Sequence, residues 1–149
     1  MIGGRQTLTI IPQGPPGPPT NLQLSREPRE VKLKDECITV AASGEDVYVG
    51  TEHGKILKID EQGQVQVFAD IGGYIVGLAI HSGTLYVLNT EYASEIGIFQ
   101  YDLGTMQRTG FWNHDDTSTH YGSRMVITNH ESQNQLVVTG VTNHRLTIY

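Results

Sequence analysis

Three short apolar motifs that recur along the chain constrain its fold more than any other feature. They are VYV (47–49), LYV (85–87) and LVV (136–138). The stretch 38–70 shows the surroundings of such a motif: short runs with strand spacing, separated by SGED, TEHG and EQG. In these breaks glycine can take the positive φ of a tight turn. Four short strands repeating at about 35–45 residues predict the four-stranded antiparallel blades of an all-β protein, a β-propeller.

The repeat divides the chain into three blades, which we expect in 38–70, 71–122 and 123–149. Residues 1–12 hold a strand (6–11) that could close a blade, and residues 13–37 are a proline-rich linker with a short strand (31–33). The expected blade strands are 38–42, 47–50, 56–60 and 64–68, then 75–80, 84–89, 96–101 and 106–112, and finally 124–128, 135–139 and 145–149. The third blade is therefore incomplete, because it has no outer strand.

Three blades are too few to close a ring, because propellers typically have four to eight. Two solutions follow: the chain is part of a longer one, or two copies form a six-bladed ring. We expect the homodimer, in which each copy lends strand 6–11 to the incomplete third blade of the other. Ring closure of this kind removes exposed sheet edges.

The composition disfavours several classes of partner. The net charge is −6, which disfavours nucleic acid and anionic membrane surfaces, and we expect no cofactor. Cys37 is the only cysteine, so no internal disulfide can form. The chain has no Asn-x-Ser/Thr sequon, and its N-terminus lacks the apolar core of a signal peptide. These features favour an intracellular setting.

Loops at one end of the blades carry the candidate ligand-binding residues. In a propeller, the turns after the second and fourth strands open on the same face, where ligands usually bind. Aromatic rings beside carboxylate, imidazole and amide groups suit a peptide or a sugar ring, although loops are polar wherever they lie. The candidates are Glu52, His53, Tyr74, Glu91, Tyr92, Trp112, Tyr121, Asn143, His144 and Arg145.

The densest polar cluster consists of His114, Asp115, Asp116 and His120. Two imidazoles and two carboxylates could hold a divalent ion, but their spacing matches no standard metal signature and a solvated loop explains them. We therefore predict no metal site. We also predict no catalytic residue, because the sequence has no nucleophile elbow, P-loop, dinucleotide fingerprint or Cys-x-x-Cys pair.

The segment LVVTGVTNHRLTIY (136–149) resembles the consensus of NHL-repeat propellers, in which a strand ending in valine is followed by Asn-His-Arg and another apolar strand. The segment VYVGTEHGKILKID (47–60) is a more degenerate match, and the resemblance covers about 38–149. The family's aspartate at the end of the second strand is missing here. The resemblance implies a six-bladed fold that binds proteins or RNA, and the acidic charge argues against RNA.

Three hypotheses for the function follow. The first is a non-enzymatic binding propeller that presents its loop rim to a protein or glycan partner. The second is a carbohydrate-binding lectin propeller, favoured by the aromatic residues of the rim. The third is a metal-dependent hydrolase similar to gluconolactonases, another six-bladed group. The missing catalytic motifs favour the first hypothesis over an enzyme.

Overall fold

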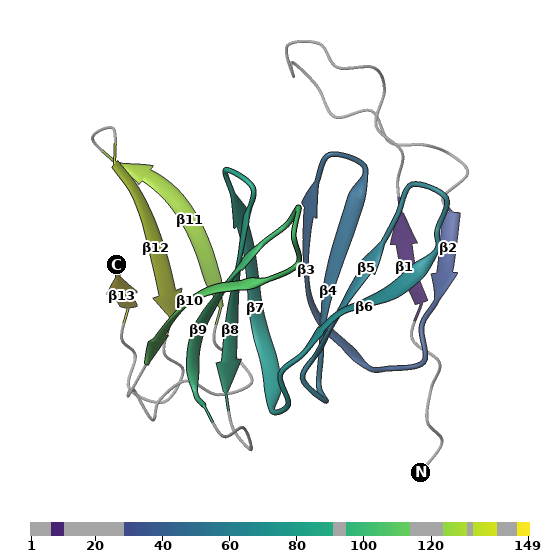
Figure 1. Ribbon diagram of the computed structural model, residues 1–149, viewed down its shortest axis with the longest axis horizontal. Helices are drawn as coiled ribbons and strands as arrows, with labels where there is room; N and C mark the ends of the chain where they lie inside the picture. The colour runs from purple at the N-terminus through teal and green to yellow at the C-terminus, as the bar shows by residue number, and fades with distance from the viewer. Residues whose placement is uncertain (1–6, 11–28, 91–94, 114–123, 131–132, 140–145) are drawn as a thin grey trace. The chain divides into compact units, whose positions relative to one another are not determined.

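The computed structural model describes residues 7–10, 29–90, 95–113, 124–130, 133–139 and 146–149 (Figure 1). The regular elements of the described residues are all β-strands, and each strand pair is antiparallel. The predicted all-β class with antiparallel sheets is therefore confirmed. The chain divides into two compact units, Met1–Glu36 and Cys37–Tyr149.

The first unit contains one strand pair. Strand β1 (Thr7–Ile10) pairs with β2 (Arg29–Lys32), and Leu8 lies opposite Val31. The predicted loan of strand 6–11 to another copy stays a prediction. It would require β1 to leave this pairing.

The second unit contains three sheets whose strands follow one another in chain order (Figure 1). The first sheet has four strands: β3 (Cys37–Ser43), β4 (Asp46–Thr51), β5 (Lys55–Ile59) and β6 (Val65–Asp70). The second has β7 (Tyr74–His81), β8 (Thr84–Thr90), β9 (Gly97–Asp102) and β10 (Arg108–Asn113). The described third sheet has β11 (Met125–His130), β12 (Gln133–Thr139) and β13 (Leu146–Ile148).

Each strand expected from the sequence in 38–149 overlaps one of these strands. The motifs VYV, LYV and LVV lie in β4, β8 and β12, which are the second strands of their sheets. β-branched and aromatic residues pack well on a pleated surface, which explains why these motifs form strands. The number of blades and the closed ring stay predictions.

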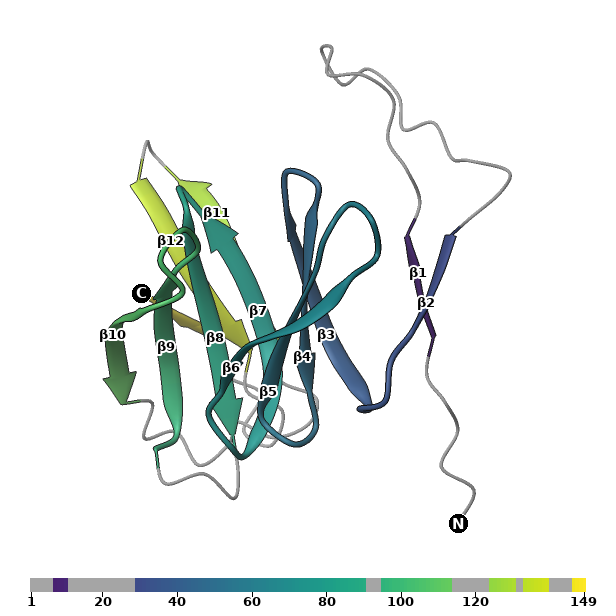
Figure 2. The ribbon, with the colours of Figure 1, turned by 45° about the vertical axis from the view of Figure 1, so that its right-hand side comes forward.

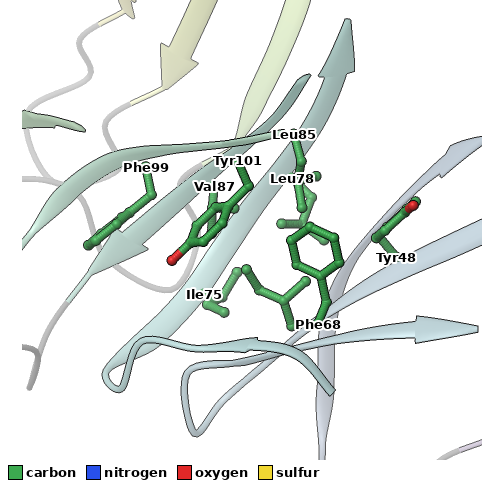
Figure 3. Packing of buried hydrophobic residues seen from close by; sticks show 9 residues of the cluster. Tyr48, Phe68, Ile75, Leu78, Leu85, Val87, Phe99 and Tyr101 are labelled. Carbon is green, nitrogen blue, oxygen red and sulfur yellow. The ribbon is translucent and has the colours of Figure 1, made fainter. Parts of the chain in front are cut away.

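An aromatic and aliphatic core lies between the first and second sheets (Figure 3). Phe68 of β6 meets Tyr48 of β4 edge to face at a centroid distance of 5.5 Å. It also meets Tyr101 of β9 at 5.8 Å. Such pairs contribute about 0.5–1.5 kcal/mol beyond the burial of their area. These contacts fix the first sheet on the second.

Figure 2 shows the second sheet between the first and third sheets. A second core lies on the face of the second sheet that meets the third sheet. It is aliphatic at its centre, where Val76 and Leu88 of the second sheet meet Met125 and Val138 of the third. Because side chains alternate along a strand, neighbouring residues of β7 serve different cores: Ile75 enters the first and Val76 the second.

The outer faces of the first and third sheets carry exposed apolar side chains. The pairing register places these side chains on the faces turned away from the second sheet. They are Val40, Val65 and Val67 on the first sheet and Val126, Leu146 and Ile148 on the third.

Candidate functional site

Buried polar side chains fix the loop-bearing end of the first two sheets. At the end of β4, the Thr51 hydroxyl accepts a hydrogen bond from the Lys55 amide at 3.0 Å and donates one to the Lys55 carbonyl at 3.1 Å. At the end of β8, Asn89 donates from Nδ2 to the Glu95 carbonyl at 3.5 Å. Both side chains are fully buried. These bonds hold the strand ends from which the loops project.

Glycine completes the turn after β4. Gly54 has a φ of +77°, and an added Cβ would overlap the backbone of Gly72. The Ile71 amide also donates to the Gly54 carbonyl at 2.9 Å. The turn 52–54 is therefore pinned to the connection between the first and second sheets.

Three of the predicted ligand-binding residues lie at this end. Glu52 and His53 occupy the turn, with Nδ1 of His53 3.6 Å from Oε1 of Glu52. The His53 side chain is exposed, with 69% of its surface accessible. Tyr74 begins β7 and packs partly against the second core. Others lie outside the described residues: Glu91, Tyr92, Tyr121, Asn143, His144 and Arg145, together with the metal candidates His114, Asp115, Asp116 and His120.

Trp112 is the remaining predicted ligand-binding residue among those that the structure describes, and it lies away from the turn that carries Glu52 and His53. Its ring stacks on that of Tyr86, with centroids 6.2 Å apart and planes 2° from parallel. Both rings lie on the face of the second sheet that meets the third sheet. They line a pocket of about 150 Å³ between these two sheets. The lining residues are His81, Tyr86, Trp112, Ile127, Asn134, Gln135, Leu136 and Tyr149.

A hydrogen-bond chain joins the two sheets at one side of the pocket. Asn129 donates from Nδ2 to Oδ1 of Asn134 at 3.1 Å. Nδ2 of Asn134 lies 2.9 Å from Nε2 of His81. An amide nitrogen is a donor, so Nε2 of His81 is the acceptor of this hydrogen bond. The polar groups of His81 and Asn134 thus bond to each other across the sheets.

An ion pair lies on the opposite face of the second sheet. Arg108 donates to both carboxylate oxygens of Glu95, at 2.9 and 3.3 Å. The guanidinium lies over the rings of Phe99 and Phe111, 4.7 and 5.0 Å from their centroids. The hydrogen bond from Arg108 lowers the pKa of the Glu95 carboxyl. This arrangement joins β9 to β10 and lies on the side of the sheet away from the pocket.

The described residues contain no group of three or more histidine, cysteine, aspartate or glutamate side chains placed to hold a metal ion. Within the same residues, no helix is long and apolar enough to cross a membrane.

Sequence reasoning missed the pocket residues other than Trp112. Tyr86 is the central residue of LYV and Tyr149 ends the third apolar run, so both lay within recognised strands. The signal that could have found them is the equivalence of the repeats, which places Tyr86 where Tyr48 lies in the first sheet. An apolar strand motif predicts core residues, whereas polar and aromatic loop residues predict ligand binding, so the sequence alone does not distinguish Tyr86 from a core residue.

No protein-family model matches the chain, and no curated protein sequence matches it. Among solved structures it resembles a complex of S. cerevisiae Dbp5 and Gle1 variants with Nup159, IP6 and ADP, with 18% identity and a TM-score of 0.46. It also resembles the crystal structure of the N-terminal domain of Nup159, with 17% identity and a TM-score of 0.48. The matches cover 87% and 88% of this chain, and 33% of each matched chain. The chain therefore spans about a third of the length of these neighbours.

Proposed function

We propose that this chain is a non-enzymatic binding module, built as part of a propeller, that takes a protein partner. The pocket between the second and third sheets carries this proposal. Trp112 and Tyr149 are 45% and 46% exposed at its mouth. Half-exposed tryptophan and tyrosine side chains beside a concave site are typical of residues that dominate protein–protein binding energy.

A protein partner fits the lining better than a glycan does. A sugar ring needs polar partners for its hydroxyl groups, because unpaired buried polar groups are costly. The two polar side chains that join the sheets, His81 and Asn134, already bond to each other. Ile127, Leu136 and the aromatic rings supply most of the remaining surface. A lectin is thus the weaker hypothesis, and a hydrolase has no support from a metal-binding group among the described residues.

The experiment is affinity capture from cell extract with the chain and two variants, followed by binding measurements with the purified captured protein. Trp112→Ser removes the exposed ring at the pocket. Ile96→Ser removes an exposed apolar side chain that is neither part of the pocket lining nor on the outer faces of the first and third sheets, and it serves as the control. We expect Trp112→Ser to weaken binding of the purified partner at least about tenfold, with little change for Ile96→Ser. Binding to a glycan array without any protein partner would contradict the proposal.

We also propose that two copies of the chain associate. The first and third sheets each pack one face on the second sheet, and their other faces carry exposed apolar residues. In the proposed contact, the outer face of the first sheet packs on the outer face of the third sheet of another copy. This contact would repeat the face-to-face packing of sheets seen within one chain. Such a head-to-tail contact produces a closed ring when the rotation between the copies allows it. Light scattering tests it, and a 16.4 kDa species at all concentrations would contradict it.

A further inference from the structure

Strand β10 has fewer buried side chains than its counterpart in the first sheet. Within the described sheets, β6 and β10 each stand last and each pair with a single neighbouring strand. Phe68 anchors β6 in the first core, with only 6% of the residue exposed. In β10, Phe111 is only partly buried and Trp112 is 45% exposed. The position of β10 therefore depends on contacts made near the surface.

Two consecutive aromatic residues of β10 point to opposite faces of the second sheet, because side chains alternate along a strand. Phe111 lies opposite Phe99 of β9 and packs against the first core. Trp112 lies opposite Ile98 and stacks on Tyr86, on the face that meets the third sheet. A shift of β10 relative to β9 would consequently move both rings of β10 together.

The ion pair of Glu95 and Arg108 spans the length of the pair formed by β9 and β10. Arg108 begins β10, and Glu95 stands two residues before the start of β9. Because the two strands are antiparallel, these residues lie at opposite ends of the strand pair. The Arg108 side chain bridges them across the rings of Phe99 and Phe111.

The geometry of this ion pair favours a measurable effect. Exposed ion pairs generally contribute little, because solvent screens them, but a bidentate arginine–carboxylate pair is an exception. Here two guanidinium nitrogens bond to the carboxylate of Glu95, and the guanidinium of Arg108 lies over two aromatic rings. The two side chains are still 40% and 47% exposed, so dissolved ions reach the pair. Its strength should therefore depend on the salt concentration.

We infer that the Glu95–Arg108 ion pair is a charge-dependent strap that fixes the edge strand β10 and thereby positions Trp112 on the opposite face of the second sheet. Arg108 is a positioning residue in this arrangement, because it acts through Phe111 and the backbone of β10. The inference rests on the proposed function only for its effect on the protein partner. A change in charge on one face of the sheet should thus alter the surroundings of Trp112 on the other.

Trp112 makes the inference measurable, because it is the only tryptophan of the chain. The measurements are its emission maximum and its quenching by acrylamide, which carries no charge. In about 1 M NaCl the screening length falls to about 3 Å, which weakens the ion pair. We expect the emission of the unmodified chain to shift to longer wavelength as salt is added. Its quenching constant should rise by at most about twofold, because 45% of Trp112 is already exposed.

Two substitutions and their combination test the order in which the residues act. Glu95→Gln removes the charge at nearly constant shape, so it should produce the change at low salt and abolish the further response to salt. Arg108→Gln also removes the contact with the rings of Phe99 and Phe111 and should produce a larger change. The double variant should match Arg108→Gln alone, because Glu95 acts through Arg108.

The first sheet offers a matched control. Asp46 of β4 accepts an ion pair from Lys58 of β5 at 2.9 Å, with side chains 33% and 24% exposed. Asp46→Asn removes this pair from a sheet that lies on the other side of the second sheet from Trp112. It should leave the emission of Trp112, its quenching and its response to salt unchanged.

The outcomes separate this inference from the proposed function. An unmodified chain without a response to salt overturns the strap even where a variant does not fold. An unchanged emission in Glu95→Gln, the same change in Asp46→Asn, or additive changes in the double variant also overturn it. If Glu95→Gln alters the surroundings of Trp112 and weakens binding of the captured partner, both proposals are supported. If it alters them while partner binding is unchanged, the strap stands and the role of the pocket in the proposed function is contradicted.

Discussion

Gly50 lies so close to Ile75 that a Cβ on Gly50 would overlap the Cγ2 atom of Ile75. This contact joins β4 of the first sheet to β7 of the second. We predict that Gly50→Ala lowers the free energy of unfolding by about 1–3 kcal/mol, because the packed strands must move apart. Urea unfolding measures the change. Gly104→Ala is the control, because its Cβ would meet only Oδ1 of Asp102 at 3.4 Å.

A buried hydroxyl closes the turn after β4. Thr51→Val removes both hydrogen bonds to Lys55 and leaves backbone groups of the turn without this partner. We expect a loss of about 1–3 kcal/mol in the free energy of unfolding. Thr51→Ser keeps the hydroxyl and should lose less. Equal losses for the two variants would show that the methyl group, not the hydroxyl, stabilises the turn.

The ring of Phe68 connects the aromatic residues of the first core. We predict that Phe68→Ala lowers the free energy of unfolding by about 3–5 kcal/mol, because it leaves a cavity between Tyr48 and Tyr101. Val67→Ala changes an exposed neighbour on the other face and should cost less than about 1 kcal/mol. Thermal unfolding followed by circular dichroism compares the two. Similar melting temperatures would contradict the packing described for Phe68.

Acid should weaken the turn that follows β9. Thr105 donates from its amide and its hydroxyl to Oδ1 of Asp102, at 2.7 and 2.9 Å, and these bonds lower the pKa of the Asp102 carboxyl. Because the folded-state pKa is depressed, the stabilisation is present above the ordinary pKa of 3.8 and is lost as the pH falls through the folded value.

We therefore expect Asp102→Asn to be less stable than the unmodified chain at about pH 7, with the difference narrowing below about pH 4. Urea midpoints measured across this range provide the test. Glu95 titrates in both proteins, so its contribution cancels in the comparison. A difference that stays constant with pH would exclude this role for the Asp102 charge.

The strands could be predicted because their signal is local. Alternating apolar residues and glycine-containing breaks fixed the positions of β4 and β8 to within a residue. The turn that carries Glu52 and His53 was predictable for the same reason. The three sheets of the second unit follow one another in the same order as the three recurring motifs of the sequence.

The pocket could not be predicted because it depends on contacts between sheets. Trp112 precedes a polar segment in the sequence, and this position predicts a loop residue at the end of a blade. Its side chain instead faces the third sheet and stacks on Tyr86. Whether such a ring is buried depends on what the next sheet places against it. Tyr48 and Tyr86 occupy equivalent strand positions, yet only the first lies in a filled interface.

The second sheet contributes one face to each of the two cores. The order in which the sheets unfold should therefore not be random. Detachment of the third sheet would uncover Val76 and Leu88 but leave the aromatic cluster around Phe68 assembled. Disruption of the second sheet would expose both interiors at once. Early fraying should therefore start at the third sheet, and amide protons of β7 and β8 should be among the last to exchange with solvent.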